Sequence, residues 1–282
     1  MAVSKCTYRF LGCSGLKVSN LCLGAMTFGE HRGGRPGQCD EATAHAIMDK
    51  FAELGGNFID TADVYQYGVA EEYVGSWLSM KQRDRFIIAT KVNFNMDPTQ
   101  QDPNKRGLSR HHILNSIDGS LRRLQTDYVD LYQVGREQQR EKFVIATKVC
   151  GPMGQDPNQL GLSRHHIMAS IDKSLKRLQT DYVDLYQAGR NAVTAASGCL
   201  SPPAGKSVAQ VSLRWLLQKD VVSSVIIGVK TLQQLEDNMG AADGWELTQQ
   251  QMDDLDAASA VEIPYPYEMV WRANKAAGRQ RP

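Results

Sequence analysis

Short apolar runs alternate with longer segments of helical periodicity along most of this chain, and this alternation limits the folds open to it. The longer segments place apolar side chains three and four residues apart, and two of them begin behind a residue that favours a helix N-cap, Asp40 or Ser109. Strands that alternate with helices form parallel βα units, and the number of units favours a closed barrel over an open sheet. The expected strands are 21–25, 57–60, 86–91, 128–134, 143–148, 182–188 and 221–228.

One barrel accounts for the length of 282 residues as a single domain, although two ordinary domains would also fit this length. We therefore expect residues 1–282 to form an α/β fold, a TIM-type (β/α)8-like barrel that is incomplete or irregular because it has about seven strands. Residues 8–10 and 16–18 flank a glycine-containing turn and are expected to form an N-terminal β-hairpin.

An internal repeat interrupts the regular alternation. Residues 107–136 return as 161–190 with differences at five of the thirty positions, and the strand at 86–92 returns at 143–149. The duplicated strand–helix–strand unit therefore covers 86–136 and 143–190. Only eight residues separate position 134 from position 143, whereas a parallel crossover needs about a dozen or more. Either this joint is strained or the second copy lies outside the regular barrel.

Two neighbouring expected strands end in a charged residue, Asp60 and Lys91. A charge at the edge of an apolar core is costly unless it finds a partner, so adjacent parallel strands would let these two residues neutralise each other. Tyr65 follows the first strand, and a nearby ammonium makes a phenol a better proton donor near neutral pH. The same three residues would also be explained by an ion pair that only holds the strand ends together. The repeat offers a second lysine, Lys148, so the sequence leaves open which lysine pairs with Asp60.

Several motifs in this order resemble those of the aldo-keto reductases, most closely the aryl-alcohol-dehydrogenase-like branch. The motifs are LGCSGLKVSNLCLGAMTFG, IDTADVYQYG, IIATK and VIIGVKTLQQLEDN, and the resemblance covers residues 5–134 and 205–260. It implies reduction of aldehyde or ketone carbonyls by NADPH, with Tyr65 as the acid, Lys91 beside it and Asp60 as the anchor of Lys91. The family histidine after the fourth strand is absent, because Gly135 and Gly189 occupy its position in the two copies.

The resemblance also implies where NADPH or NADP would bind. The expected contacts lie after the last strand and at the start of the following helix, with one further residue after the first strand. They are Thr27, Gly228, Lys230, Thr231, Gln234, Asp237 and Asn238. Backbone N–H groups at a helix start and a cation beside them form an anion site, although Lys230 stands where the family often has arginine. The alternative interpretation is that these residues form only an ordinary transition from a loop to a helix and bind no cofactor.

Composition argues against several classes of partner. Lys+Arg 32 against Asp+Glu 31 leaves a net charge of +1, which predicts neither nucleic-acid nor membrane binding. No apolar run reaches the roughly 18–20 residues of a membrane helix, and the N-terminus lacks an apolar signal core. The six cysteines show no metal spacing and indicate reduced thiols in a cytoplasmic protein. Neither the pair 111–112 nor the pair 165–166 of adjacent histidines converges as metal ligands would on a helix, so we expect no metal site.

The sequence therefore predicts an NADPH-dependent oxidoreductase that acts on small-molecule carbonyl substrates, with activity impaired by the missing histidine. The alternative is a non-catalytic NADP-binding or partner-binding barrel. The substrate and the oligomeric state are not determined by the sequence.

Overall fold

The computed structural model describes residues 6–29, 38–96, 99, 102–134, 146–149, 185–188 and 205–258, with the backbone alone for 146–149 and 185–188. Five parallel strands form the main sheet, in the order β6-β5-β4-β3-β9. These strands are β3 (Leu21–Gly24), β4 (Phe58–Asp60), β5 (Ile87–Val92), β6 (Leu131–Val134) and β9 (Val225–Gly228). The strands β7 (Ala146–Val149) and β8 (Leu185–Ala188) form a separate parallel pair. The seven expected strands are all present, and the described strands do not close the barrel.

The expected N-terminal hairpin is confirmed. It consists of β1 (Tyr8–Phe10) and β2 (Lys17–Ser19), which pair antiparallel. Its residues Leu11 and Val18 are fully buried in a cluster with Cys22, Phe58 and Ala89 from the sheet. The hairpin therefore covers one face of the sheet. The opposite side chains of the same strands, such as Leu23 and Ile59, pack into the main core with the helices.

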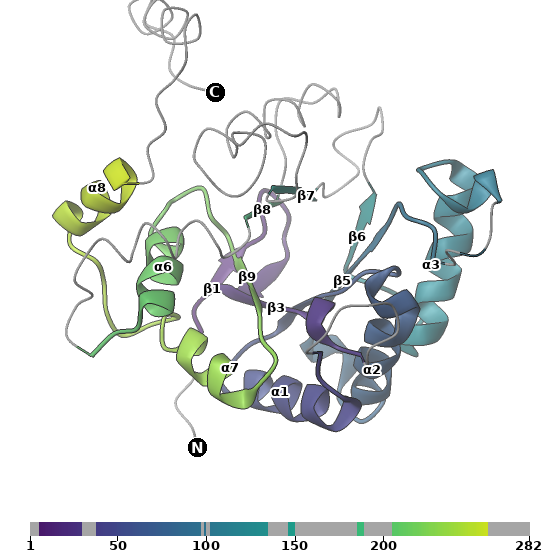
Figure 1. The fold of residues 1–282 in the computed structure, drawn as a ribbon, viewed down its shortest axis with the longest axis horizontal. Coiled ribbons are helices and arrows are strands. Elements are labelled where there is room, and N and C mark those ends of the chain that lie inside the picture. The colour runs from purple at the N-terminus through teal and green to yellow at the C-terminus, as the bar shows by residue number, and fades with distance from the viewer. Residues whose placement is uncertain are drawn as a thin grey trace, which may run out of the picture.

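Helices lie on the outside of the main sheet, with α1, α2 and α7 along one side and α3 and α6 at opposite ends (Figure 1). They are α1 (Glu41–Glu53), α2 (Val69–Leu78), α3 (Arg110–Leu124), α6 (Val208–Leu217), α7 (Leu232–Met239) and α8 (Gln249–Ala258). Short 3₁₀ helices occur at η1 (Ala25–Thr27), η2 (Tyr65–Gly68), η3 (Arg83–Arg85) and η4 (Pro103–Lys105). The expected N-caps are formed, because Asp40 accepts from the backbone N–H of Thr43 and Ser109 from that of His112. None of the helices in the described ranges has the length and apolar character of a membrane span.

The duplicated unit keeps the same strand register in both copies. In the first copy Ala89 is paired with Leu131 and Lys91 with Gln133. In the second copy the corresponding backbone positions 146 and 185, and 148 and 187, are paired in the same way. The strands β7 and β8 pair with each other and not within the five-stranded sheet, while β8 also contacts β9. Whether the joint is strained or the second copy lies outside the regular barrel stays a prediction. That residues 1–282 form a single domain stays a prediction.

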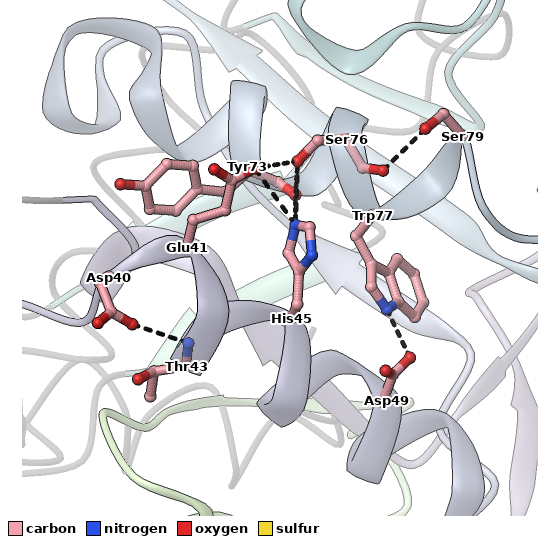
Figure 2. Close-up of polar contacts among 9 residues, drawn as sticks. All are labelled: Asp40, Glu41, Thr43, His45, Asp49, Tyr73, Ser76, Trp77 and Ser79. Carbon is pink, nitrogen blue, oxygen red and sulfur yellow. Dashed lines mark hydrogen bonds and ion pairs between the residues drawn. The ribbon is translucent and has the colours of Figure 1, made fainter.

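Polar contacts fix α2 against α1 (Figure 2). The indole Nε1 of Trp77 donates to Asp49 at 2.8 Å, and Nε2 of His45 lies 2.9 Å from Oγ of Ser76. The Ser76 hydroxyl in turn donates to Glu41 at the start of α1. Both the serine and the glutamate approach the Nε2 side of the imidazole, so the group lacks the arrangement of a nucleophilic triad, in which the acid binds Nδ1. We assign these contacts to helix packing.

Candidate active site

The predicted pairing of Asp60 with Lys91 is confirmed. Nζ of Lys91 donates to Oδ2 of Asp60 at 2.6 Å and also to the backbone carbonyl of Thr61. The pair forms because β4 and β5 are parallel neighbours, with Asp60 opposite Ala89, so that the longer lysine side chain reaches back to the carboxylate. Asp60 is 1% exposed, and a carboxylate this deeply buried needs its partner. Nothing is described of the Lys148 side chain.

A third residue, Gln133 on β6, completes the group and was missed by the sequence reasoning. Its Nε2 donates to the second oxygen of Asp60, Oδ1, at 2.7 Å. Gln133 lies opposite Lys91 in the β5–β6 register and is buried. The available signal was a polar residue near the end of an otherwise apolar strand. Side chains alternate between the two faces of a sheet, so Gln133, which is paired with Lys91, lies on the same face as the lysine. Both carboxylate oxygens of Asp60 are therefore hydrogen bonded.

Tyr65 begins η2 and lies against the lysine. Nζ of Lys91 lies 5.0 Å from the centroid of the tyrosine ring, within the range of a cation–π contact. The residues that follow, Gln66 and Tyr67, have φ of 49° and 55°, and Gly68 has φ of 97°. Left-handed backbone at two consecutive non-glycine residues costs about 1 kcal/mol or more each, so the tertiary structure must hold this turn in place. The turn follows Tyr65 directly and leads the chain into α2.

A second buried ion pair, between Glu71 and Arg123, packs against the turn at residues 66–68. Glu71, in the first turn of α2, is fully buried and accepts hydrogen bonds from Nε of Arg123 at 2.8 Å and from the hydroxyl of Thr90. Thr90 immediately precedes Lys91 on β5, and Arg123 comes from the last turn of α3. The Cδ atom of Arg123 also packs beside Gly68, where a β-carbon would clash with it. Glu71 therefore joins α2, α3 and β5 directly behind the lysine.

Asp63 lies in the loop between β4 and η2 and is 1% exposed. Its backbone N–H donates to the carbonyl of Lys91 at 3.3 Å, while its Oδ2 atom is buried with no hydrogen-bond partner among the described residues. Burial, followed by the nearby charge of Glu71, raises the pKa of Asp63 to about 7. Burial also raises the pKa of Tyr132, which lies on β6 near the same two acids.

The predicted cofactor residues lie at the same edge of the sheet. Gly24 at the end of β3 is paired with Asp60 on one side and with Gly228 on the other. Two strand spacings therefore separate Asp60 from Gly228, a distance of about 10 Å. Beside Gly228 the space is open, because a β-carbon there would meet no atom within 4 Å. The Thr27 hydroxyl donates to the carbonyl of Val229 and ties η1 to the segment after β9.

The N-terminus of α7 is already ordered by its own side chains. The hydroxyl of Thr231 caps the helix by accepting from the backbone N–H of Gln234 at 3.2 Å. The side chain of Gln234 accepts from the backbone N–H of Lys230 at 2.9 Å, so this donor has a partner within the chain. The Lys230 side chain is exposed next to the helix start, where a cation and the helix dipole both favour an anion.

The remaining two predicted cofactor residues differ in their surroundings. Asp237 is engaged within the protein, since Ser207 donates to it at 3.0 Å and Gln210 donates to its carbonyl at 2.9 Å. Asn238 is 1% exposed, and both polar atoms of its side chain lack partners among the described residues. Such an amide offers one donor and one acceptor, as an adenine edge requires. Lys230, Asn238 and the open space beside Gly228 thus fit a nucleotide, whereas Asp237 connects α6 and α7.

A family model decides the classification of the chain. The model described as the aldo/keto reductase family matches residues 20–138, 133–197 and 200–260. The chain belongs to the aldo/keto reductase family. The first two matched segments overlap at 133–138, where the first copy of the repeat ends.

Individual aldo/keto reductases are similar to parts or to all of the chain. A norsolorinic acid reductase of Aspergillus flavus is 42% identical over 132 residues, which is 45% of this chain and 34% of that protein. An aryl-alcohol dehydrogenase of Pestalotiopsis microspora is 40% identical over 42% of this chain and 32% of its own length. The chain thus spans about a third of the length of each relative. A solved aldo-keto reductase of Bacillus halodurans, in its holo form, has the same fold with a TM-score of 0.60 and 23% identity. That match covers 93% of this chain and 99% of the solved one.

Two predictions concern residues outside the described ranges. Gly135 and Gly189, at the position of the family histidine, are not among the described residues. The expected absence of a metal site stays a prediction; within the described ranges no group of three potential ligands occurs, and His112 bonds to the carbonyl of Gly107 at 2.8 Å. Within the described ranges no disulfide involves Cys6, Cys13, Cys22 or Cys39.

Proposed function

We propose that this protein reduces the carbonyl group of small aldehydes or ketones with NADPH, and that Tyr65 donates the proton. The position of Lys91 is the observation that supports this proposal most directly. Its ammonium is bound to Asp60 and lies 5.0 Å from the centroid of the Tyr65 ring. The group lies at the carboxyl ends of the parallel strands, the edge at which barrel enzymes hold their active sites. NADPH, when bound, supplies a hydride to the carbonyl carbon.

Each residue of the group has one role in this scheme. The hydroxyl of Tyr65 gives its proton to the carbonyl oxygen as that oxygen gains negative charge. The ammonium of Lys91 favours the phenolate that remains. Asp60 fixes the ammonium by its 2.6 Å hydrogen bond, and Gln133 fixes Asp60 from the other side. The ion pair is therefore buried with all its carboxylate oxygens satisfied, which limits the cost of burying it.

The preference for NADPH over NADH rests on the cation at the start of α7. Lys230 is exposed beside the N-terminus of α7, and a 2′-phosphate would meet both its ammonium and the helix dipole. Lysine binds phosphate as a point charge without the two parallel hydrogen bonds of arginine. We therefore propose NADPH binding that is weaker than with arginine at this position. Asn238 would hold the adenine ring by its amide.

The missing histidine limits the proposed activity. Val134 ends β6, and Gly135 follows it without a side chain that could donate to the substrate oxygen. Losing one such donor reduces turnover by about 10²–10³-fold. We propose a slow reductase for this reason.

The test compares two tyrosines of the same short helix. Oxidation of NADPH in the presence of an aromatic aldehyde is followed for the unchanged protein, for Tyr65→Phe and for Tyr67→Phe. The aldehyde is chosen because one relative is named an aryl-alcohol dehydrogenase. Tyr67 is 43% exposed and serves as the matched control. We expect Tyr65→Phe to lose turnover by about 10²-fold or more while Tyr67→Phe keeps it. Equal turnover in all three proteins would refute the assignment of Tyr65.

A non-catalytic NADP-binding or partner-binding protein is the second candidate, favoured by the glycine at position 135. Fluorescence titration with NADPH separates the two candidates. Binding that Lys230→Gln weakens and that Lys17→Gln, on the distant hairpin, leaves unchanged would support the nucleotide site. Binding without any turnover would favour the second candidate, and no binding would disfavour both.

We also propose a cytoplasmic location. The lack of a disulfide at the four described cysteines supports a reducing compartment.

A further inference from the structure

Three acids and two cations meet behind the proposed proton donor. Lys91 is bound to Asp60, and Arg123 is bound to Glu71. Both cations therefore already have a carboxylate partner. Asp63 is the third acid, and its Oδ2 atom has no hydrogen-bond partner among the described residues. With every acid ionised, the group would carry one excess negative charge in an interior that excludes water.

The surroundings of Asp63 decide which acid holds a proton. The other two carboxylates accept short hydrogen bonds from cations, and this favours their ionised forms. Among the described residues the Asp63 carboxyl accepts from the backbone N–H of Val64, while Glu71 repels its charge from α2. Its other charged and titratable neighbours in the part of the chain that the structure describes are Arg123 from α3, Lys91 from β5 and the phenol of Tyr132 from β6.

We infer that Asp63 is a positioning residue of the site: it is uncharged in the active protein, and its ionisation weakens Tyr65 as a proton donor. The inference rests on the proposed function as far as turnover is concerned. The coupling follows from the backbone, because the N–H of Asp63 donates to the carbonyl of Lys91 and places the carboxyl beside that strand. An added negative charge there offsets the ammonium, so the phenol gives up its proton less readily.

Ionisation of Asp63 also changes stability in a defined direction. The pKa of about 7 in the folded protein lies above the ordinary value of 3.8, so the folded state binds a proton that the unfolded chain has released. Stability from this proton is present at acidic pH and is lost as the pH rises towards about 7. Asn at this position cannot ionise and removes the dependence. The exposed Asp84 provides a matched control.

The experiment compares the unchanged protein with Asp63→Asn and Asp84→Asn. Melting temperatures are measured between about pH 5.5 and pH 8.5. We expect the unchanged protein to lose about 4 °C relative to Asp63→Asn across this range, and to keep a constant difference from Asp84→Asn. Difference infrared spectra supply a second readout, in which the carbonyl stretch of a protonated carboxyl is present at the acidic end and absent from Asp63→Asn. A melting difference that does not change with pH, with no such band, would overturn the inference.

The pH dependence of turnover tests the positioning role, because a residue with only a structural role would not change it. A fall in the rate of aldehyde reduction as Asp63 ionises, near its pKa of about 7, is expected in the unchanged protein and absent from Asp63→Asn. Coincident pH profiles would overturn the role of Asp63 in positioning. Absence of turnover from every protein would instead overturn the proposed function and the catalytic role with it, while the melting and infrared comparisons would still decide the charge of Asp63.

Discussion

Replacing Glu71 by alanine tests whether the second ion pair supports the site. Glu71 is fully buried and accepts hydrogen bonds from Arg123 and Thr90, which belong to α3 and β5. The substitution removes the carboxylate and leaves a guanidinium and a hydroxyl without their partner. It also removes the only described carboxylate that lies within hydrogen-bonding distance of Arg123.

The expected loss follows from the burial of the two partners. Removing one member of a buried ion pair costs about 3–5 kcal/mol. The Arg123 side chain is 19% exposed, so water can solvate part of its charge once Glu71 is gone. We therefore expect a loss of about 3 kcal/mol, which corresponds to a decrease of about 6 °C in Tm for a protein of this size.

The assay is urea unfolding followed by tryptophan fluorescence, with Glu72→Ala as the control. Glu72 is the next residue of the same helix and is exposed, so its replacement should change the free energy of unfolding by less than about 0.5 kcal/mol. The double variant Glu71→Leu with Arg123→Met should recover part of the loss, because it removes the unpaired charge. Equal losses from Glu71→Ala and Glu72→Ala would refute the reasoning.

Two further predictions concern helix packing and thiol reactivity. A β-carbon on Gly75 would overlap the backbone carbonyl of Arg123, so Gly75→Ala should lower the free energy of unfolding by about 2 kcal/mol or more in urea titrations. A β-carbon on Gly119 would meet only the end of the Arg123 side chain, with Nη1 nearest at 3.1 Å, so Gly119→Ala should lower it by less than about 1 kcal/mol. Burial raises the pKa of the Cys39 thiol to about 11, and Cys13 is exposed. Iodoacetamide at about pH 8 should therefore label Cys13 and spare Cys39 until denaturant is added, as peptide mass spectrometry would show, and equal labelling in the folded protein would contradict this.

Local sequence was sufficient to predict the helix starts and the presence of the strands. Asp40 and Ser109 were recognised as caps because a cap is a contact within one turn. Strand starts were less accurate, since β6 begins at Leu131 and not at residue 128. Asp130 explains the difference, because its side chain accepts from Arg83 and from the backbone N–H of Ile88. Hydrophobicity alone cannot reveal a side chain that replaces strand pairing in this way.

The candidate site was predicted only where two adjacent strands create it. Asp60 and Lys91 follow from strand order, but Gln133 requires the β5–β6 register, which the sequence does not give. Glu71 and Arg123 depend on how α2 and α3 rotate about their axes. The buried stripe of α3 includes Ser116, Gly119 and Ser120, which allow close approach to α2. A search for large apolar residues does not identify a stripe of small ones.

The equal register of the two strand pairs has a consequence for how such a chain can change in length. Both pairs have the same alignment, because position 91 is paired with 133 as position 148 is paired with 187. A unit of this kind behaves as a cassette that can be copied whole without altering the alignment of the strands it leaves behind. Insertions confined to cassette boundaries would then spare Asp60 and Tyr65, which lie upstream of both copies.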